Sequence, residues 1–229
     1  NKGKLIIPSF AIGRTQEVVF VLNKFFNDGL LPRIKVYVDS PLAVNATDIY
    51  RMHLDCMNED VKRELKEGDG DPFGFKDLIY IKKVEQSKEL NDLKEPCIII
   101  SASGMAEAGR IKHHLANNIS NPLNTILMVG YCSPTSLGAR IQEPGLKEIS
   151  IFGEVHEVKA RIARMEAFSG HGDYNEMKSF LECQDSALIK KTFLVHGEYE
   201  VQQFYKDILN KDGFENIEIP AYLNEFELN

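Results

Sequence analysis

Apolar and polar positions along the chain form blocks that predict buried strands separated by amphipathic helices. Short apolar runs bounded by turn residues are typical of buried strands. In the first interval between such runs, apolar residues recur at helical spacing, with Val18, Val21, Leu22 and Phe25 on one stripe. The predicted strands lie at residues 4–8, 34–38, 78–81, 97–100 and 125–129.

The remaining intervals of the first half complete an α/β pattern. Pro41 predicts the start of a helix that runs toward His53, because proline fits the first helical turn. Residues 57–76 are polar, acidic and rich in glycine, and they predict an exposed excursion, part helix and part loop. A second helical stripe contains Met105, Ala108, Ile111, Leu115 and Ile119. Strands that alternate with crossover helices predict a mostly parallel sheet flanked by helices.

The pattern changes after about residue 147. Residues 148–152 and 155–165 predict consecutive strands, and residues 168–173 predict a tight turn. A helix with an inner face of Met177, Phe180 and Leu181 should follow, then a buried strand at 192–195. A last helix carries Val201, Phe204, Tyr205, Ile208 and Leu209. We therefore place a domain boundary near residue 147, giving domains 1–147 and 148–229 that pack closely because no linker separates them.

Composition and charge narrow the class of protein. Of the 229 residues, 43% are hydrophobic and 27% are charged, which is typical of a soluble globular chain. No apolar run approaches the roughly 20 residues that span a bilayer, and no signal peptide is visible. The four cysteines are widely spaced, and three lie in apolar stretches where we expect buried thiols and a cytoplasmic setting. A net charge of −7 argues against a general nucleic-acid-coating protein.

Two histidines stand where chemistry is expected. His196 follows the strand 192–195 and precedes a helix, a position from which an imidazole can bind a metal or move a proton; the alternative is a histidine that only caps the strand. His171 lies between two glycines, with little core to pack against, which favours function. Asp173 and Glu176 form a capping-box pattern, so we assign Asp173 to capping first. We read His53, His113, His114 and His156 as structural or solvent-facing.

Two loops after predicted strands are candidates for phosphate binding. Ser101, Ser103 and Gly104 join a strand to a helix start, where free amide groups and the helix dipole favour an anion. Arg14 follows the first strand and could pair with phosphate through its planar guanidinium. Each signal is weak alone, since many α/β loops are small and many arginines lie on the surface.

Taken in order, five segments resemble the β-CASP family of metallo-β-lactamase-fold nucleases, which includes the cleavage subunit of the pre-mRNA 3′-end machinery and its bacterial and archaeal relatives. The resemblance covers nearly the whole chain. The segments are residues 7–17 (IPSFAIGRTQE), 37–43 (YVDSPLA), 100–110 (ISASGMAEAGR), 168–173 (FSGHGD) and 194–198 (LVHGE).

The resemblance implies a β-CASP domain followed by the C-terminal part of a metallo-β-lactamase αββα sandwich, with RNA in a cleft between them. It implies that His171 assists at the scissile phosphate and that His196 is a zinc ligand. The family's His-x-His-x-Asp-His run, which supplies most ligands of two zinc ions, is absent. Because the match starts in mid-pattern at Asn1, we expect that run upstream, and we expect this chain alone to be inactive and to hold no firmly bound zinc.

The resulting hypothesis is a zinc-dependent phosphodiesterase that cleaves RNA. The alternatives are a non-catalytic RNA-binding or scaffold paralogue of the same fold, and an unrelated phosphate-binding module that uses the Ser101–Gly104 loop. We expect single-stranded RNA as partner, allow for a homodimer and expect no membrane association. Despite the acidic chain, a local basic lining is available from Arg14, Arg110, Lys112 and Arg140.

Overall fold

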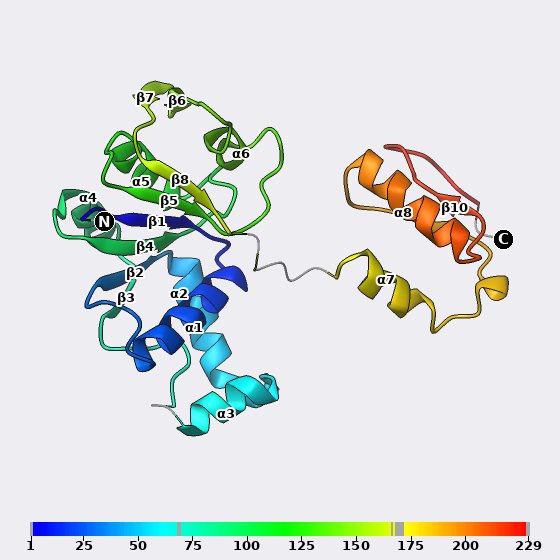
Figure 1. Cartoon of the computed structure of the whole chain (residues 1–229), viewed down its shortest axis with the longest axis horizontal. Coiled ribbons are helices and arrows are strands. Elements are labelled where there is room, and N and C mark those ends of the chain that lie inside the picture. Colours follow the sequence, from blue (N-terminus) through cyan, green and yellow to red (C-terminus); the bar gives the residue numbers. More distant parts are fainter. Residues whose placement is uncertain (1, 68–69, 166, 168–171, 228–229) are drawn as a thin grey trace. The chain divides into compact units, whose positions relative to one another are not determined.

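A computed structural model of the chain describes residues 2–67, 70–165, 167 and 172–227 (Figure 1). The chain divides into two compact units, Asn1–Phe168 and Ser169–Asn229, which we call unit 1 and unit 2 and describe separately. No helix in these described ranges is both long enough and apolar enough to cross a bilayer.

Unit 1 is built on a six-stranded sheet in the order β3-β2-β4-β1-β5-β8. Every neighbouring pair in this sheet is parallel, which confirms the predicted α/β class. The five strands predicted in the first half of the chain recur with ends that differ by at most one residue, and β8 lies within the longer strand predicted at 155–165. Their bounds are β1 (Leu5–Pro8), β2 (Lys35–Asp39), β3 (Leu78–Ile81), β4 (Cys97–Ser101), β5 (Thr125–Met128) and β8 (Arg161–Arg164).

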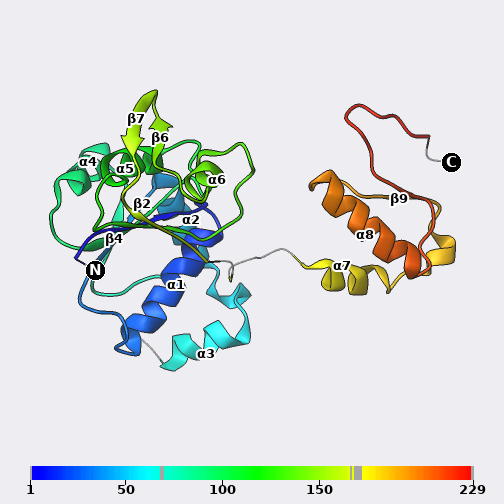
Figure 2. The same ribbon diagram turned by 45° about the horizontal axis from the view of Figure 1, so that its top comes forward.

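Helices cover both faces of the sheet (Figure 2). Side chains alternate between the faces along each strand, so Ile6 and Ile99 belong to one buried cluster while Ile7 and Ile100 belong to the other. The first cluster packs under α4, α5 and α6, and the second under α1 and α2. The helix bounds are α1 (Arg14–Asn27), α2 (Pro41–Met52), α4 (Val84–Asp92), α5 (Arg110–Asn118) and α6 (Leu137–Ile141).

The segment 57–76 is less exposed than its composition predicts. It contains the helix α3 (Glu59–Glu67), but Phe73 and Phe75 beyond it are buried. Phe75 stacks on Phe26 at 5.1 Å between ring centroids. Arg51 holds the loop through two hydrogen bonds to the Asp71 carboxylate, at 3.1 and 2.8 Å. The segment therefore packs against the core through Phe73 and Phe75. Its acidic composition alone did not predict this packing.

The helix predicted from Met105 begins later, at Arg110. Residues before it form a loop in which the Ser103 amide donates to the Ala108 carbonyl and the Ala106 amide to the Ser103 carbonyl. Gly109 ends the loop with a φ of 82°, outside helical geometry. The apolar stripe thus extended the predicted helix across a loop in which Ala106 is buried but Ala108 is exposed.

The residues after 147 stay with unit 1 up to β8. A hairpin of β6 (Glu148–Ile151) and β7 (Glu154–Glu157) buries Ile149 and Ile151 in the cluster under α5. β8 then joins the edge of the main sheet beside β5. The compact units therefore divide after residue 168, although the pattern changes near 147; the assignment of domains 1–147 and 148–229 stays a prediction.

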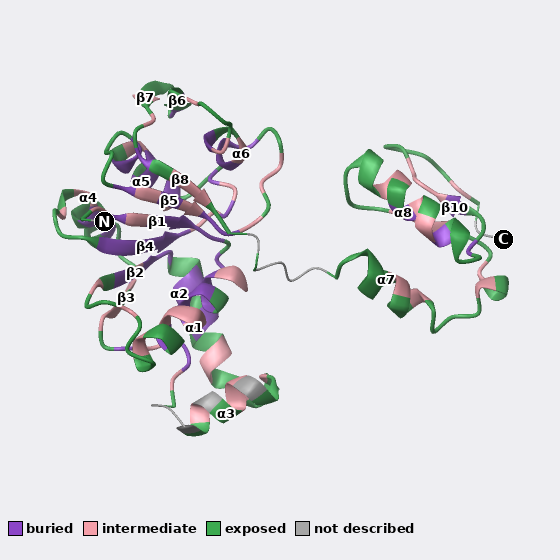
Figure 3. Ribbon diagram, viewed as in Figure 1, coloured by how far each residue is buried: buried purple, intermediate pink, exposed green. Residues whose placement is uncertain are grey.

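Unit 2 is small and sparsely buried (Figure 3). Its buried cluster contains Tyr205, Leu209, Phe214 and Ile217. The prediction that the helix after residue 173 buries Met177 and Phe180 is wrong within this unit, because both side chains are exposed. The expected strand at 192–195 is shorter and only half-buried. The elements are α7 (Tyr174–Leu181), the 3-10 helix η2 (Ser186–Leu188), β9 (Thr192–Phe193), α8 (Tyr199–Lys211) and β10 (Ile217–Glu218), with β9 and β10 parallel.

Candidate functional site

The carboxyl edge of the sheet in unit 1 has a topological switch point between β1 and β4. From β1 the chain crosses to β2 on one side, and from β4 it crosses to β5 on the other. These two connections run in opposite directions, with α1 on one face of the sheet and α5 on the other, and ligands of open α/β sheets bind in the crevice at such a point. The loops after β1 and β4 carry the predicted phosphate residues Arg14, Ser101, Ser103 and Gly104, so the fold brings these loops to one edge.

The loop after β1 is held firmly to its neighbour. The Ser9 amide donates to the Ser101 carbonyl at 3.0 Å, and the Thr15 hydroxyl donates to the Phe10 carbonyl at 2.7 Å. Gly13 caps α1 with a φ of 81°, a left-handed conformation that suits glycine. Arg14, the first residue of α1, pairs with Glu17 at 2.5 Å. Its guanidinium is therefore at the predicted edge but shares its charge with a carboxylate.

In the loop after β4, contacts within the protein account for the presence of Ser101 and Gly104. The Ser101 side chain is buried, and its hydroxyl donates to the Asp39 carbonyl at 2.8 Å. A Cβ at Gly104 would lie 2.8 Å from the Phe10 ring, so only glycine fits there without movement. Ser103 is half-exposed and is the hydroxyl of this loop most open to a ligand. Phosphate binding by these residues stays a prediction.

A buried carboxylate, Asp39, ties this edge together and was not among the predicted site residues. It ends β2 with no exposed surface. Its Oδ1 accepts from Arg110 at 2.6 Å, and its Oδ2 accepts from the Ser87 hydroxyl at 2.5 Å and lies 2.6 Å from Nε2 of His114. Arg110 also donates to the Lys82 carbonyl at 2.8 Å. Asp39 thereby links β2 to both α4 and α5.

The electrostatics of Asp39 favour the ionised carboxylate. Burial alone would raise its pKa, but hydrogen bonds from His114, Ser87 and Arg110 outweigh burial and lower the pKa below its ordinary value. An ionised Asp39 requires the His114 ring to donate through Nε2. Arg110 is predicted to form part of a basic lining, but it also pairs with this carboxylate, and the buried His114 has a structural role here. The signal available in the sequence was an aspartate directly after a buried strand.

The predicted basic lining is present in part. A cavity of about 690 Å³ opens beside the start of α5, and its lining includes Lys88, Arg110, Lys112 and His113. Phe152, at the tip of the β6–β7 hairpin, borders it, with the Lys112 ammonium 4.8 Å from the ring centroid. Arg110 pairs with Asp39, so the other charged residues of the lining are Lys88, Lys112 and Glu107.

In unit 2, His196 lies in the loop between β9 and α8. Its side chain is exposed and has no hydrogen-bond or ion-pair partner among the described residues. Its backbone has a φ of 65°, in the left-handed region that few non-glycine residues adopt. The loop is anchored by the side-chain amide of Gln202, whose Nε2 donates to the Leu194 carbonyl at 3.1 Å. An unengaged imidazole on an anchored loop is available to bind a metal.

His171 lies outside the described residues, so its role stays a prediction. The turn that follows it is described, and the capping box is confirmed. The Asp173 carboxylate accepts from the amides of Asn175 and Glu176 at 2.8 and 3.0 Å, and Glu176 accepts from the Asp173 amide at 2.9 Å. This arrangement fixes the N-cap of α7, Asp173, two residues after His171.

Comparison with known proteins gives two family matches in sequence order. Residues 15–141 match the Beta-Casp domain, and residues 155–220 match the Zn-dependent metallo-hydrolase RNA specificity domain. Together they cover most of the chain, and residues 142–154 lie between them.

Curated relatives agree with these matches. The chain is 33% identical over 224 residues to an RNase J-like protein of Methanocaldococcus jannaschii, an alignment that covers 97% of this chain and 49% of the relative. It is 34% identical over 200 residues to Ribonuclease TTHA0252 of Thermus thermophilus, covering 86% and 44%. It is 29% identical over 201 residues to transcription termination factor FttA of Methanosarcina mazei, covering 86% and 31%. The chain thus spans less than half the length of each of these relatives.

Proposed function

The chain belongs to the β-CASP family of metallo-β-lactamase-fold RNA nucleases, and from this premise we propose that it acts, within a longer protein, as part of a zinc-dependent phosphodiesterase that cleaves single-stranded RNA. The observation that carries the proposal is the succession of a Beta-Casp domain and an RNA specificity domain of zinc-dependent hydrolases along one chain. Relatives named as ribonucleases support the same reaction.

His196 is the residue of this chain that we assign to the zinc. Its exposed, unengaged imidazole fits a ligand role. A catalytic zinc needs about three protein ligands and an open position. No group of three such donors around His196 occurs in the described residues. We therefore propose that the other ligands come from protein outside these 229 residues, in line with relatives that are about twice as long.

The bound zinc would supply a water activated for attack on phosphorus. The residues of this chain would bind the metal, contact the phosphates and transfer the proton. His196 would complete the metal shell, and His171 would contact the scissile phosphate or hold the proton that the leaving oxygen takes up. The loops after β1 and β4, with Arg14 and Ser103, would receive neighbouring phosphates at the switch point of the sheet. Lys88 and Lys112 are the cations that we assign to the path of the RNA.

Cleavage of a labelled single-stranded RNA by the full-length protein tests this function. We expect cleavage that chelation abolishes and added zinc restores, and RNA binding that weakens as salt rises, because phosphate neutralisation releases counterions. The 229-residue chain alone should bind RNA without cleaving it. A zinc-loaded full-length protein that binds RNA but never cuts it would instead support a non-catalytic paralogue.

A further inference from the structure

Three side chains of the kinds that bind metal ions lie together in unit 1, just after α2. His53 ends that helix, and the 3-10 helix η1 (Leu54–Cys56) follows directly. Side chains at i and i+3 eclipse in a 3-10 helix, because three residues complete a turn. The Cys56 amide donates to the His53 carbonyl at 3.1 Å, as this geometry requires. The backbone therefore brings an imidazole and a thiol to the same side.

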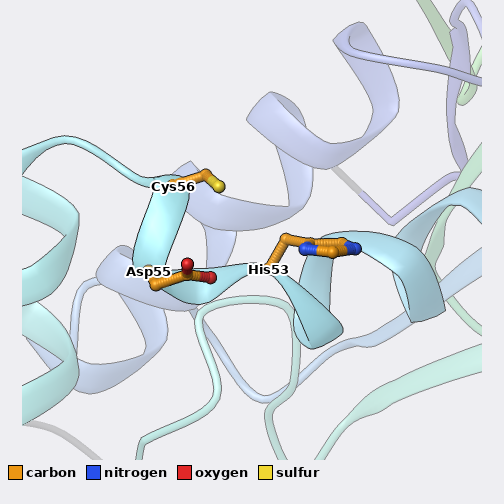
Figure 4. Close-up of side chains that lie close together, drawn as sticks. All are labelled: His53, Asp55 and Cys56. Atoms are coloured by element: carbon orange, nitrogen blue, oxygen red, sulfur yellow. The ribbon is translucent and has the colours of Figure 1, made fainter.

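Three donors of different chemistry gather at this turn (Figure 4). The ligand atoms of His53, Asp55 and Cys56 lie within 4.8 Å of one another. All three side chains are exposed, and none has a hydrogen-bond or ion-pair partner in the described part of the chain. Leu54 and Met57 pack against the core instead. The core thus anchors the turn, while its outer side presents three donors that the fold does not use.

We propose that His53, Asp55 and Cys56 bind one zinc ion. Thiolate, imidazole and carboxylate are the ligands that zinc takes in proteins, at about 2.0 to 2.3 Å. The thiolate selects zinc over magnesium or calcium, which take oxygen ligands. Small rotations of three exposed, unengaged side chains close the ligand set, and water fills the fourth position. The C-terminal end of α2 adds a partial negative charge that favours a cation.

The proposed site takes all its ligands from one turn of unit 1. It uses neither His171 nor His196, and it does not depend on the proposed function. It revises our assignment of His53 to a structural or solvent-facing role. It also revises the expectation that the isolated chain holds no zinc, which was argued only from the single catalytic ligand, His196.

Titration of the metal-free, reduced 229-residue chain with cobalt(II), followed by zinc(II), tests the site. We expect one equivalent of cobalt to bind with a near-ultraviolet thiolate-to-cobalt charge-transfer band, and zinc to displace it. The Cys56 thiol gives up its proton to the buffer on binding, so affinity should rise with pH. C56S should remove the band, and H53A should weaken binding by more than about tenfold, since loss of even a residue that supports a ligand costs about 10- to 100-fold.

Two variants serve as controls. Cys183 is the other exposed cysteine of the chain, so C183S should leave the band and the affinity unchanged. H196A should also leave them unchanged, which separates this site from the catalytic ligand. A wild-type chain that gives no thiolate band would overturn the proposal, as would a band that survives C56S. Either result leaves the nuclease function untouched, because that function uses other residues.

Discussion

The two units of this protein differ in how much of their apolar surface they bury. Unit 1 places a six-stranded sheet between two buried clusters, and it buries an aspartate within a hydrogen-bonded network. The described part of unit 2 has four buried apolar residues, while Phe180 is 76% and Val195 68% exposed. A unit of about 60 residues buries only about 60% of its unfolded surface and is marginally stable alone.

This difference suggests a division of roles: unit 1 provides the stable framework, and unit 2 provides the histidine assigned to the metal. In unit 1 the predicted phosphate loops are fixed by hydrogen bonds and by close packing, so substitutions there should act first on stability. In unit 2 the histidine assigned to the metal is exposed and unengaged, so its substitution should act on metal binding with little effect on folding. The following predictions test that separation.

The largest effect should come from His171→Ala in the full-length enzyme. A positioned general acid or base contributes about 100- to 10,000-fold, so we expect turnover to fall by a comparable factor. Bound zinc should be retained, because His171 is not assigned as a ligand. Single-turnover cleavage of labelled RNA measures the effect, with His156→Ala in the β6–β7 hairpin as the matched control. Unchanged turnover would remove His171 from the mechanism.

The next effect should be on the stability of unit 1. Removing one partner of a buried ion pair leaves an uncompensated charge and costs about 3 to 5 kcal/mol. Asp39→Ala should lower the free energy of unfolding of unit 1 by this amount, as measured by denaturant titration. Asp77→Ala is the control, because Asp77 pairs with Lys35 on the surface, where an ion pair contributes little. Equal losses in the two variants would show that burial of Asp39 has no special role.

Leu209→Ala should destabilise unit 2 by about 2 to 5 kcal/mol, the usual cost of truncating a fully buried leucine. Amide hydrogen exchange should then quicken in α8 and β10 and stay unchanged in the strands of unit 1. Phe180→Ala, at an exposed position, should leave exchange in both units unchanged. Faster exchange in the main sheet of unit 1 after Leu209→Ala would mean that the two units fold as one.

The smallest effect should be a dependence on acid pH. The pKa of Asp39 is lowered in the folded protein, so its contribution to stability is fully present above the unfolded value of about 3.9 and is lost as pH falls through the folded pKa. The gap in unfolding free energy between wild type and Asp39→Asn should therefore narrow below about pH 4. A gap that stays constant from neutral to strongly acid pH would contradict the lowered pKa.

The strands of unit 1 were predictable because each is a short apolar run between turn residues, and β3 has the predicted bounds. The Asp39 network was not, since its partners Ser87, Arg110 and His114 are 48, 71 and 75 residues away and no local pattern relates them. The faces of α7 were predicted wrongly for a different reason. The spacing of apolar residues predicts a buried position for Phe180, but it cannot tell whether residues of the same unit cover that side chain, and within unit 2 they do not.

The position of β8 in the sheet is another feature that local sequence patterns did not predict. Its residues follow a hairpin and predict a further strand, but only the parallel pairing with β5 assigns it to the main sheet. Likewise, the sequence predicts that Ser101 and Gly104 bind phosphate, which stays a prediction. Their observed contacts, to Asp39 and toward Phe10, explain them without any ligand. Of that loop, Ser103 stays the candidate whose side chain is open to phosphate.

The central claim, that an exposed imidazole of unit 2 binds the catalytic zinc, is tested most directly by metal analysis of the full-length protein. Zinc per chain should be measured for wild type, His196→Ala and His171→Ala, each also carrying Cys56→Ser so that the surface site does not contribute. We expect a loss of zinc in the His196 variant and wild-type content in the His171 variant. Undiminished zinc in the His196 variant would contradict the account.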